Sequence, residues 1–556
     1  MKDILSYESD IWSCADLLIS SGIKQSKFPD YMMPFFALIM LEGRMCNEMR
    51  DIEETEGISP ADKIEDFIEA FRDRDCGYND YIVRHGKTLS DICNNDKTFE
   101  QDFSEYLAGF DATLKELLGI ERGTDDSKYL NLDGMIAELR KKGILMQYIT
   151  KWAQIDLSPY NNSEITTLEE HIKRKWADIS AETAGEQYTP EDIISLIAEI
   201  VAAKTAGHPR QDYLWLYDPT CGGANLLFGV ADRLNAAGLP LIATRGQDFN
   251  DALYALACIE SLFRDEAKIE YGNTLTQGKF NGIEFDVVVA NPPYGIPWKG
   301  FDKEIRADQT GQFAFLPSVS DGQLLFLQHN VNHLHDDRGI VVEVNNGSSL
   351  FSGDAGSGES NIRKYLFDND WVESIIQMPS DEFFNTGIVT YLWILNKNKP
   401  EDRHDKVVLI NASELWQPLK KNKGSKRKEM NENHRAAIVS ALVEFRDSEI
   451  SKVYDKWHFY FNKQKIQLTD PEHPKGKYND YEIVPYNPSN NESDIDAFLA
   501  RYITKPFKKL DNTVGVEVNF NKEFYVPETV EPVENILAEI ADIDRDLANL
   551  EKELGV

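Results

Sequence analysis

The 556-residue sequence contains no apolar run long enough to cross a bilayer. Its longest apolar run, around Met32 to Leu41, has about half the length that a membrane-spanning helix needs. The N-terminus, M-K-D-I-L-S-Y-E, also lacks the apolar segment and the small-residue cleavage site of a signal peptide. We therefore expect a cytoplasmic protein without membrane association.

Cysteine is scarce, and the six residues are scattered along the chain without a C-x-x-C pair. The pattern indicates neither a zinc site nor a disulfide framework, so we expect reduced thiols and no bound metal. A hydrophobic fraction of 42% and a charged fraction of 28% are typical of a soluble globular protein.

Basic charge is also in deficit, with 59 Lys and Arg against 94 Asp and Glu and a formal net charge of -35. Because the neutralisation of phosphates requires Lys and Arg, this balance argues against a chain that grips nucleic acid with most of its surface. Any nucleic-acid binding needs a local basic patch or a basic partner.

The length predicts more than one domain. Residues 1–165 show helical periodicity and an acidic excess, which predicts a separate helical domain. From about 185 to 400, β-rich runs alternate with helical patterns, which is typical of an α/β domain with a mostly parallel sheet. The catalytic domain is predicted over 166–480 and a C-terminal extension over 481–556. Strands are expected at 213–217, 241–243, 268–271, 285–290, 339–344, 372–378 and 389–395.

Small, polar and acidic residues follow the ends of these strands. The segment D-P-T-C-G-G begins at Asp218, and a strand, glycine turn and helix in series let the backbone approach a ligand at the helix N-terminus. Asp248 follows the second strand, where a carboxylate can accept hydrogen bonds from ribose hydroxyls. The third strand ends at G-N-T-L, 272–275. This series predicts a nucleoside-like cofactor across the carboxyl edge of one sheet.

The fourth strand runs into Asn-Pro-Pro-Tyr, 291–294. The Asn291 side-chain carbonyl and the Pro292 backbone carbonyl are acceptors that can converge on a planar amino group, and the prolines stiffen the turn. Tyr294 supplies a stacking face for an aromatic base that has left a duplex. Two acceptors favour a pyramidal amine nitrogen, whose lone pair can attack a methyl sulfonium without a metal or a general base.

In this order, D-P-T-C-G-G, G-Q-D-F-N, G-N-T-L and N-P-P-Y resemble the motifs of amino-group DNA methyltransferases that use S-adenosylmethionine. The chain is most similar to the methyltransferase (M) subunit of type I restriction-modification systems, nearly end to end. Segments that carry this closer resemblance are A-G-E-Q-Y-T-P-E, D-G-Q-L-L-F-L-Q-H, N-I-R-K-Y-L, S-I-I-Q-M-P, V-L-I-N-A-S and V-N-F-N-K-E-F-Y. It implies a Rossmann-like S-adenosylmethionine-dependent methyltransferase domain of α/β class, with an N-terminal all-helical domain and a C-terminal helical tail.

The resemblance also implies site residues. The catalytic set is Asn291, Pro292, Pro293 and Tyr294. The cofactor-binding set is Glu186, Gln187, Tyr188, Thr189, Pro190, Asp218, Thr220, Cys221, Gly222, Asp248 and Asn273. Within it, residues 187–189 would line the methionine end of the cofactor, residues 220–222 its middle and Asp248 its ribose. The chain departs from the family pattern at Asn225, often glycine, and at Asn273, usually aspartate.

Three local features have their own interpretation. Thr189 is predicted to cap a helix that has Pro190 at its first position and Asp192 completing a capping box. Cys221 is interpreted as a small filler of the glycine turn. The run 420–428 packs six basic residues into nine, which fits either phosphate contact or a flexible solvated loop.

The last 30 residues predict a helix whose apolar residues alternate in steps of three and four. That seam favours an intermolecular coiled coil, with folding back onto the same chain as the alternative. In the family resemblance this end packs against the specificity subunit. The apolar positions are Val533, Ile536, Ile540, Ile543, Leu547, Leu550 and Leu554.

The sequence thus predicts methyl transfer from S-adenosylmethionine to adenine N6 in duplex DNA, with the target read by a separate specificity (S) subunit. The implied complex contains two copies of this chain and a restriction (R) subunit when it cuts. Alternatives are a stand-alone DNA methyltransferase, cytosine N4 methylation, a protein-glutamine methyltransferase and a non-catalytic assembly subunit that has lost cofactor binding through Asn225 and Asn273.

Overall fold

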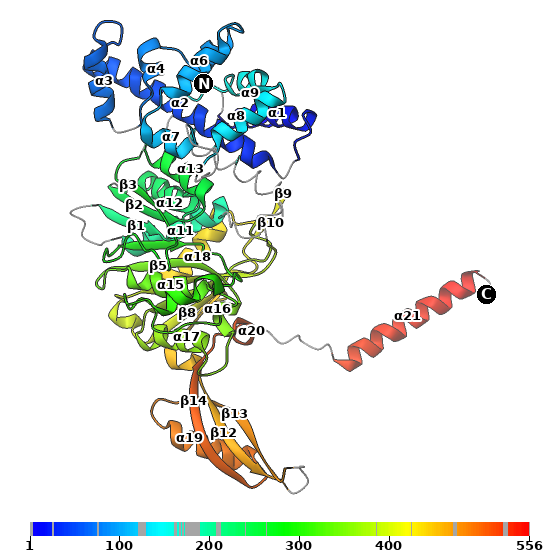
Figure 1. Cartoon of the computed structure of the whole chain (residues 1–556). Coiled ribbons are helices and arrows are strands. Elements are labelled where there is room, and N and C mark those ends of the chain that lie inside the picture. The colour runs from blue at the N-terminus through cyan, green and yellow to red at the C-terminus, as the bar shows by residue number, and fades with distance from the viewer. Residues whose placement is uncertain are drawn as a thin grey trace. The chain divides into compact units, whose positions relative to one another are not determined.

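The computed structural model separates into two compact units, Met1–Val518 and Asn519–Val556, each of which is described by itself (Figure 1). No helix within the described residues is long and apolar enough to span a bilayer. The structure describes residues 4–24, 27–74, 77–120, 129–160, 164, 165, 168, 172, 189–206, 213–239, 241–262, 264–384, 386–423, 425–470, 475–525 and 532–554.

The N-terminal part of the first unit is helical, as predicted. Its longest helix, α2, buries Met32, Phe36 and Leu38, and apolar faces of the shorter helices complete this core. Some of these helices begin at a side-chain cap; the Asn79 side chain, for example, accepts hydrogen bonds from the backbone N–H groups of Tyr81 and Ile82 in α4. The helices are α1 (Tyr7–Ser20), α2 (Phe28–Glu56), α3 (Ile64–Asp73), α4 (Asp80–His85), α5 (Leu89–Cys93), α6 (Phe99–Ala108), α7 (Ala112–Leu118), α8 (Leu132–Lys141) and α9 (Leu145–Trp152).

A nine-stranded sheet follows, in the order β11-β8-β6-β7-β5-β4-β1-β2-β3. All the predicted strands are present in it, and β1 to β5 pair in parallel. β7 lies antiparallel between β5 and β6. The strands are β1 (Leu214–Asp218), β2 (Ile242–Asp248), β3 (Ala267–Tyr271), β4 (Val287–Ala290), β5 (Ile340–Asn346), β6 (Val372–Gln377), β7 (Thr390–Asn396), β8 (Lys406–Asn411) and β11 (Ser451–Asp455).

The strand order reverses between β1 and β4. From β1 the chain moves outward through β2 to β3 and then returns to place β4 on the other side of β1. In open α/β sheets, ligands bind outside the carboxyl ends of strands at such a switch point. Flanking helices are α11 (Glu191–Thr205), α12 (Asn225–Ala236), α13 (Asp251–Ser261), α14 (Asp302–Arg306), α15 (Gln323–Asn332), α16 (Ser348–Phe351), α17 (Gly358–Asp368) and α18 (Glu432–Glu444).

The lysine-rich run forms a β-hairpin and not the solvated loop offered as one alternative. Strands β9 (Gln417–Lys423) and β10 (Lys426–Glu429) pair antiparallel. Lys426 is buried, and its ammonium donates hydrogen bonds to the carboxylates of Asp192 and Glu382. Burial and the charge of Asp192 raise the pKa of the Glu382 carboxyl, whereas Lys426 opposes that rise. At least this lysine is therefore an internal structural residue.

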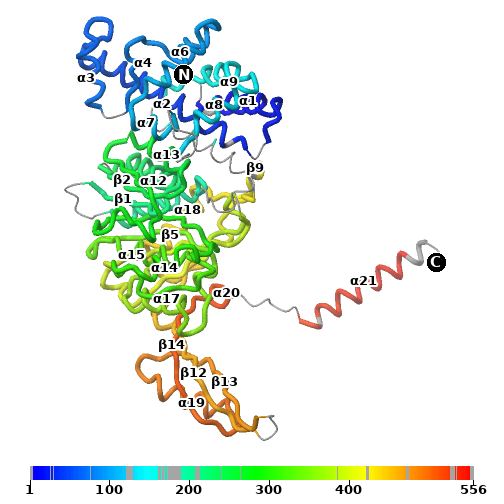
Figure 2. The backbone as a smooth tube through the Cα atoms, in the orientation of Figure 1, coloured from blue at the N-terminus to red at the C-terminus, as the bar shows by residue number. Residues whose placement is uncertain are grey.

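The region after β11 holds a second, three-stranded antiparallel sheet in the order β13-β12-β14, which the sequence patterns did not predict. It comprises β12 (Tyr460–Thr469), β13 (Lys477–Pro485) and β14 (Phe507–Val516), with α19 (Asn491–Tyr502) connecting β13 to β14 (Figure 2). Residue 480, the predicted end of the catalytic domain, lies inside β13. The division into 1–165, 166–480 and 481–556 stays a prediction.

The second unit contains α20 (Phe520–Glu523) and the predicted C-terminal helix, α21 (Val533–Leu554). The apolar seam of α21 is exposed: Ile543 is 65% exposed and Leu547 54%. Seven large apolar side chains are exposed among the described residues of α21, and a partner helix that covered them would remove the free-energy cost of holding them in water.

Candidate active site

Asp218 ends β1 and is buried. Its Oδ1 accepts hydrogen bonds from the backbone N–H of Thr220 at 2.9 Å and from the Thr220 hydroxyl at 3.4 Å, which closes the turn after the strand. Burial raises the pKa of the Asp218 carboxyl to about 8, and the backbone N–H of Thr220 opposes that rise. Among the described residues no Lys or Arg pairs with Asp218, so a buried carboxyl faces the switch point without a cation.

The glycine turn continues from Cys221 to Ala224, and α12 begins at Asn225. Gly222 and Ala224 have φ of +53° and +65°, so the left-handed conformation precedes Asn225, which lies in the first helical turn. Because Asn225 needs no glycine-like backbone, its departure from the family pattern leaves the turn intact.

Cys221 packs against Gly246 of β2. A Cβ built on Gly246 would lie 2.9 Å from the Cys221 Sγ and 2.7 Å from Ile269 Cδ1, so only glycine leaves room for the thiol. Burial, followed by the charges of Asp248 and Asp218, raises the pKa of the Cys221 thiol. A neutral, enclosed thiol fits the interpretation of Cys221 as a filler.

Asp248 is the last residue of β2, and its side chain connects the end of β2 to the glycine turn that follows β1. Its Oδ2 accepts a hydrogen bond from the Gly222 N–H at 2.8 Å, and its Oδ1 accepts one from the Asn250 N–H at 2.8 Å. Burial raises the pKa of this carboxyl, and the backbone donors oppose the rise. Each carboxylate oxygen retains a second lone pair, so Asp248 can still accept from a ligand hydroxyl.

Asn273 follows β3 and accepts a hydrogen bond from the Leu275 N–H through its Oδ1 at 3.0 Å. The preceding Gly272 has φ of +142°, which lets the chain turn at the strand end. The neighbouring Thr274 hydroxyl donates to the Pro219 carbonyl and ties this loop to the turn after β1. Predicted cofactor residues from three strands therefore lie in one connected set of loops.

The N-P-P-Y segment begins directly after β4. Asn291 is buried, and its Nδ2 donates a hydrogen bond to the Thr189 Oγ1 at 3.0 Å. Tyr294 is 8% exposed at the end of the turn. Because the amide nitrogen of Asn291 donates to Thr189, the amide oxygen of Asn291 lies on the side of its side chain that faces away from Thr189.

This contact corrects the helix start predicted for 189–192. Helix α11 begins at Glu191 with Pro190 as its N-cap, and neither Thr189 nor Asp192 forms the predicted capping box. The Thr189 hydroxyl is used by Asn291, and the Asp192 carboxylate accepts from Lys426 and from the Met430 N–H. Tertiary contacts have taken both side chains away from the local backbone.

A polar cluster that sequence reasoning did not assign to the site lies beside N-P-P-Y. Asp321 Oδ1 accepts a hydrogen bond from the backbone N–H of Gly295, the residue after Tyr294, at 3.1 Å. The Gln323 amide donates to Asp321, to Asn346 at the end of β5 and to Ser348. In the sequence, this cluster could have been found from the polar segments D-G-Q, 321–323, before a helix and N-N-G-S, 345–348, at the end of a strand.

Glu186, Gln187 and Tyr188 lie outside the described residues. The structure describes Thr189, Pro190 and the residues that follow β1, β2, β3 and β4. Hydrogen bonds in the turns join Asp218, Thr220, Gly222 and Asp248 in one group, and another hydrogen bond joins Asn291 with Thr189. No group of three or more His, Cys, Asp or Glu suited to a metal ion occurs in the part of the chain that the structure describes.

Comparison with known proteins gives the family. A family model described as N-6 DNA Methylase matches residues 164–482. The chain belongs to the N-6 DNA methylase family. It is 26% identical over 453 residues to the type I restriction enzyme MpnII methylase subunit of Mycoplasma pneumoniae, covering 75% of this chain and 80% of that protein.

This N-6 DNA methylase is also 29% identical over 288 residues to the MjaVIII methylase subunit of Methanocaldococcus jannaschii, covering 49% of this chain and 46% of that one. Its fold matches a type I restriction-modification methyltransferase subunit from Streptococcus thermophilus with a TM-score of 0.65 and 20% identity, over 82% of this chain and 96% of that structure. The resemblance to type I methyltransferase subunits that the sequence motifs indicated is confirmed. The protein is an S-adenosylmethionine-dependent adenine DNA methyltransferase.

The residues present fit that cofactor. S-adenosylmethionine carries positive charge on its sulfonium and ammonium groups and two hydroxyls on its ribose. Asp218 and Asp248 are carboxyl groups whose pKa values burial has raised and which have no Lys or Arg partner among the described residues. A cationic, hydroxyl-bearing ligand supplies the positive charge that these two groups lack, and its hydroxyls can donate to the lone pairs that the backbone N–H groups leave open.

Proposed function

We propose that this N-6 DNA methylase holds an adenine, flipped out of duplex DNA, against Asn291, Pro292, Pro293 and Tyr294. Asn291 provides its side-chain carbonyl and Pro292 its backbone carbonyl as acceptors for the N6 amino group. The two prolines stiffen the turn, and Tyr294 provides the ring on which the base stacks. The observation that carries the proposal is the position of Asn291, at the end of β4 beside the strand that ends in Asp218.

The chemistry follows from those acceptors. Two accepted hydrogen bonds draw the amine hydrogens toward oxygen and favour a pyramidal nitrogen with an available lone pair. S-adenosylmethionine, when bound, supplies a methyl group on a positively charged sulfur. With the donor bound, the amine nitrogen would gain the methyl carbon as the carbon–sulfur bond breaks, and the acceptor oxygens of Asn291 and Pro292 would guide its surplus proton to solvent.

The cofactor roles are part of the same proposal. Asp248 accepts from the ribose hydroxyls, Asn273 contacts the adenine moiety, and Asp218 faces the cationic end. The hydrogen bond from Asn291 to Thr189 supports a link between the two halves of the site. The remaining proposed contacts are Glu186, Gln187, Tyr188, Thr189 and Pro190 at the methionine end, and Thr220, Cys221 and Gly222 at the middle.

We further propose that the chain works as the M subunit of a type I complex: two copies, one specificity subunit that reads the duplex DNA target and a restriction subunit for cutting. The exposed apolar seam of α21 supports helix docking to the specificity subunit. The net charge of -35 supports delegation of sequence reading to another chain. A cytoplasmic location belongs to the same proposal, because the substrate is DNA.

Methyl transfer tests the catalytic part. We expect Asn291→Ala to lower the methylation rate by at least about a hundredfold, the loss typical of removing one preorganised hydrogen-bonding group. S-adenosylmethionine binding, measured by calorimetry, should change little. The distant polar substitution Asn369→Ala, at the end of α17, serves as the matched control. Absence of cofactor binding by the unaltered protein would favour a non-catalytic assembly subunit instead.

Docking is tested by deleting residues 526–556. We expect the shortened chain to bind S-adenosylmethionine normally and to lose co-purification with a co-expressed specificity protein. The methylation assay is run with and without that protein. Full activity of the unaltered chain alone would overturn the subunit assignment in favour of a stand-alone enzyme.

A further inference from the structure

The three-stranded sheet of β12, β13 and β14 has two unlike faces. One face packs on α19 through an apolar cluster of Ile466, Leu468, Val484, Ile495 and Leu499. Side chains alternate between faces along a strand, so the pairing register assigns every second residue to the opposite face. On that face Lys463 pairs with Ile483, Lys465 with Tyr481, Gln467 with Asn479 and Lys508, and Thr469 with Lys477.

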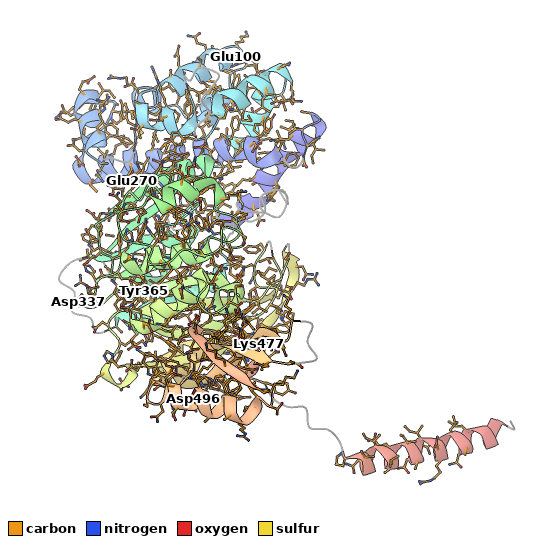
Figure 3. The ribbon with its side chains drawn as sticks, turned by 60° about the horizontal axis from the view of Figure 1, so that its bottom comes forward. Glu100, Glu270, Asp337, Tyr365, Lys477 and Asp496 are labelled. Carbon is orange, nitrogen blue, oxygen red and sulfur yellow. The ribbon has the colours of Figure 1, made fainter. Side chains whose placement is uncertain are left out.

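The charges are separated between these faces. By register, Asp480 and Glu482 of β13 oppose Ile466 and Gln464, so they belong to the side that carries α19. That helix adds further carboxylates, and Lys509 on this side is paired with Glu492 and Asp496. Figure 3 labels Lys477 on the strands and Asp496 on the helix. Only the bulge of β14, which includes Asp511, departs from this alternation.

Lysines on the open face lack acidic partners. Lys465, Lys477 and Lys508 have no ion pair with any described carboxylate, although acidic residues outnumber basic ones 94 to 59 in the whole chain. Lys463 is the exception, because its ammonium lies 2.6 Å from the Asp354 carboxylate. A set of unpaired lysines on one sheet face is unusual for a protein of this charge and leaves them available to an anionic partner.

Tyr481 and Ile483 lie opposite Lys465 and Lys463 on the open face and are 49% and 55% exposed. The Lys463 and Lys465 ammonium groups lie 4.7 and 5.9 Å from the centroid of the Tyr481 ring. Such cation–π contacts hold flexible lysine stems over the ring and reduce the entropy lost on binding. The sheet itself is fixed to the catalytic domain, since the Arg363 guanidinium of α17 donates to the Val516 carbonyl at 2.7 Å and the Val516 N–H donates to the Ser360 hydroxyl.

We propose that this open face, formed by Lys465, Lys477, Lys508 and Tyr481, binds the phosphate backbone of duplex DNA away from the flipped base. Lysine ammonium groups are point charges that neutralise phosphates without reading bases, which suits a chain whose target sequence is read elsewhere. Duplex DNA carries about one negative charge per 1.7 Å of its axis, so several lysines on one face find phosphates at once. The inference rests on the proposed function, because it takes duplex DNA as the substrate.

The test compares two triple variants of the full chain. The first carries Lys465→Gln, Lys477→Gln and Lys508→Gln. The matched control carries Arg501→Gln, Lys505→Gln and Lys509→Gln, which removes the same charge from the α19 side of the same unit. Affinity for a short labelled duplex is measured by fluorescence anisotropy over a range of salt concentrations.

Each lost phosphate contact lowers the slope of log affinity against log salt by about 0.9, so we expect the first variant to lose about 2 to 3 in slope. The control should keep the slope of the unaltered chain. A third variant with arginine at residues 465, 477 and 508 should also keep it, which separates lost charge from misfolding. Equal slopes for the first variant and the control, or no DNA affinity of the unaltered chain at low salt, would overturn the inference.

Two further readouts distinguish the possible failures. Cofactor binding and methyl transfer by the unaltered chain test the proposed function separately, so an active enzyme with an inert open face contradicts the inference alone. An acidic protein partner is the other occupant of such a face. Loss of a co-expressed partner from the first variant, with an unchanged DNA slope, would assign the face to protein binding and refute the DNA proposal.

Discussion

Replacing Thr189 by valine tests how Asn291 is held. Valine keeps the shape of the side chain and removes the oxygen that accepts the hydrogen bond from Asn291 Nδ2 at 3.0 Å. A buried polar group that loses its partner costs about 1–3 kcal/mol. If that cost turns the Asn291 amide away from the adenine amine, the rate falls by about 5- to 150-fold, at about 1.4 kcal/mol per factor of ten.

The assay is single-turnover methyl transfer from labelled S-adenosylmethionine to DNA, at saturating cofactor, with the dissociation constant of the cofactor measured by calorimetry. As a positioning residue, Thr189 should affect the rate and leave cofactor affinity nearly unchanged. Thr189→Ser retains the hydroxyl and should restore most of the rate. A Thr189→Val variant that transfers methyl at the normal rate but binds the cofactor weakly would refute this reasoning and assign Thr189 to the methionine end alone.

Three more substitutions have expected outcomes. Gly246→Ala places a Cβ 2.9 Å from Cys221 Sγ and should lower the free energy of unfolding by about 1–3 kcal/mol in denaturant titration. Lys426→Met leaves the buried Glu382 carboxylate and the largely buried Asp192 carboxylate without their cation and should cost about 3–5 kcal/mol, less at pH 5 than at pH 8. Glu343→Gln should flatten the pH dependence of stability, because burial raises the pKa of this carboxyl from its usual 4.5 to about 8. A buried carboxyl with a raised pKa stabilises the folded state fully below pH 4.5. This contribution to the free energy of unfolding falls as the pH rises from 4.5 to about 8, by at most about 1.4 kcal/mol per pH unit.

Each outcome has a control. Adding Cys221→Ala to Gly246→Ala should recover part of the stability, and no recovery would mean that the strain lies elsewhere. The exposed Lys303→Met should leave stability within about 0.5 kcal/mol at both pH values, against which the loss in Lys426→Met is judged. Equal slopes of stability against pH for Glu343→Gln and the unaltered protein would contradict the titration assigned to Glu343.

The catalytic strands were predictable because their residues carry a strong local signal. Val287–Ala290 is a continuous apolar run, as expected for a strand covered on both faces, and Asn-Pro-Pro can only follow it as a turn. Asp218 and Asp248 stand directly at strand ends, so a parallel sheet brings them to one edge whatever the loops do. These features also carried the family resemblance and, with it, the cofactor and the reaction.

Contacts between residues far apart in sequence could not be predicted in the same way. Thr189 and Asp192 read locally as a helix cap, but the fold offers them Asn291 and Lys426, 102 and 234 residues away, as stronger partners. Strands β12, β13 and β14 carry mixed polar patterns, because only one face of their sheet is covered by a helix.

The sequence by itself therefore determined the positions of seven of the nine strands of the catalytic sheet, the order of the strand-end motifs and the make-up of the proposed amine-binding tetrapeptide, since all three depend on neighbours along the chain. Only the tertiary structure decided which side chains hold those motifs in place and which lysines lie on an open sheet face. Lys426 and Lys465 are alike in the sequence, yet one is buried between two carboxylates and the other lies on an open sheet face. That difference arises from strand pairing and burial, which depend on contacts between residues that are not neighbours in the sequence, such as Lys465 with Tyr481 and Lys426 with Asp192.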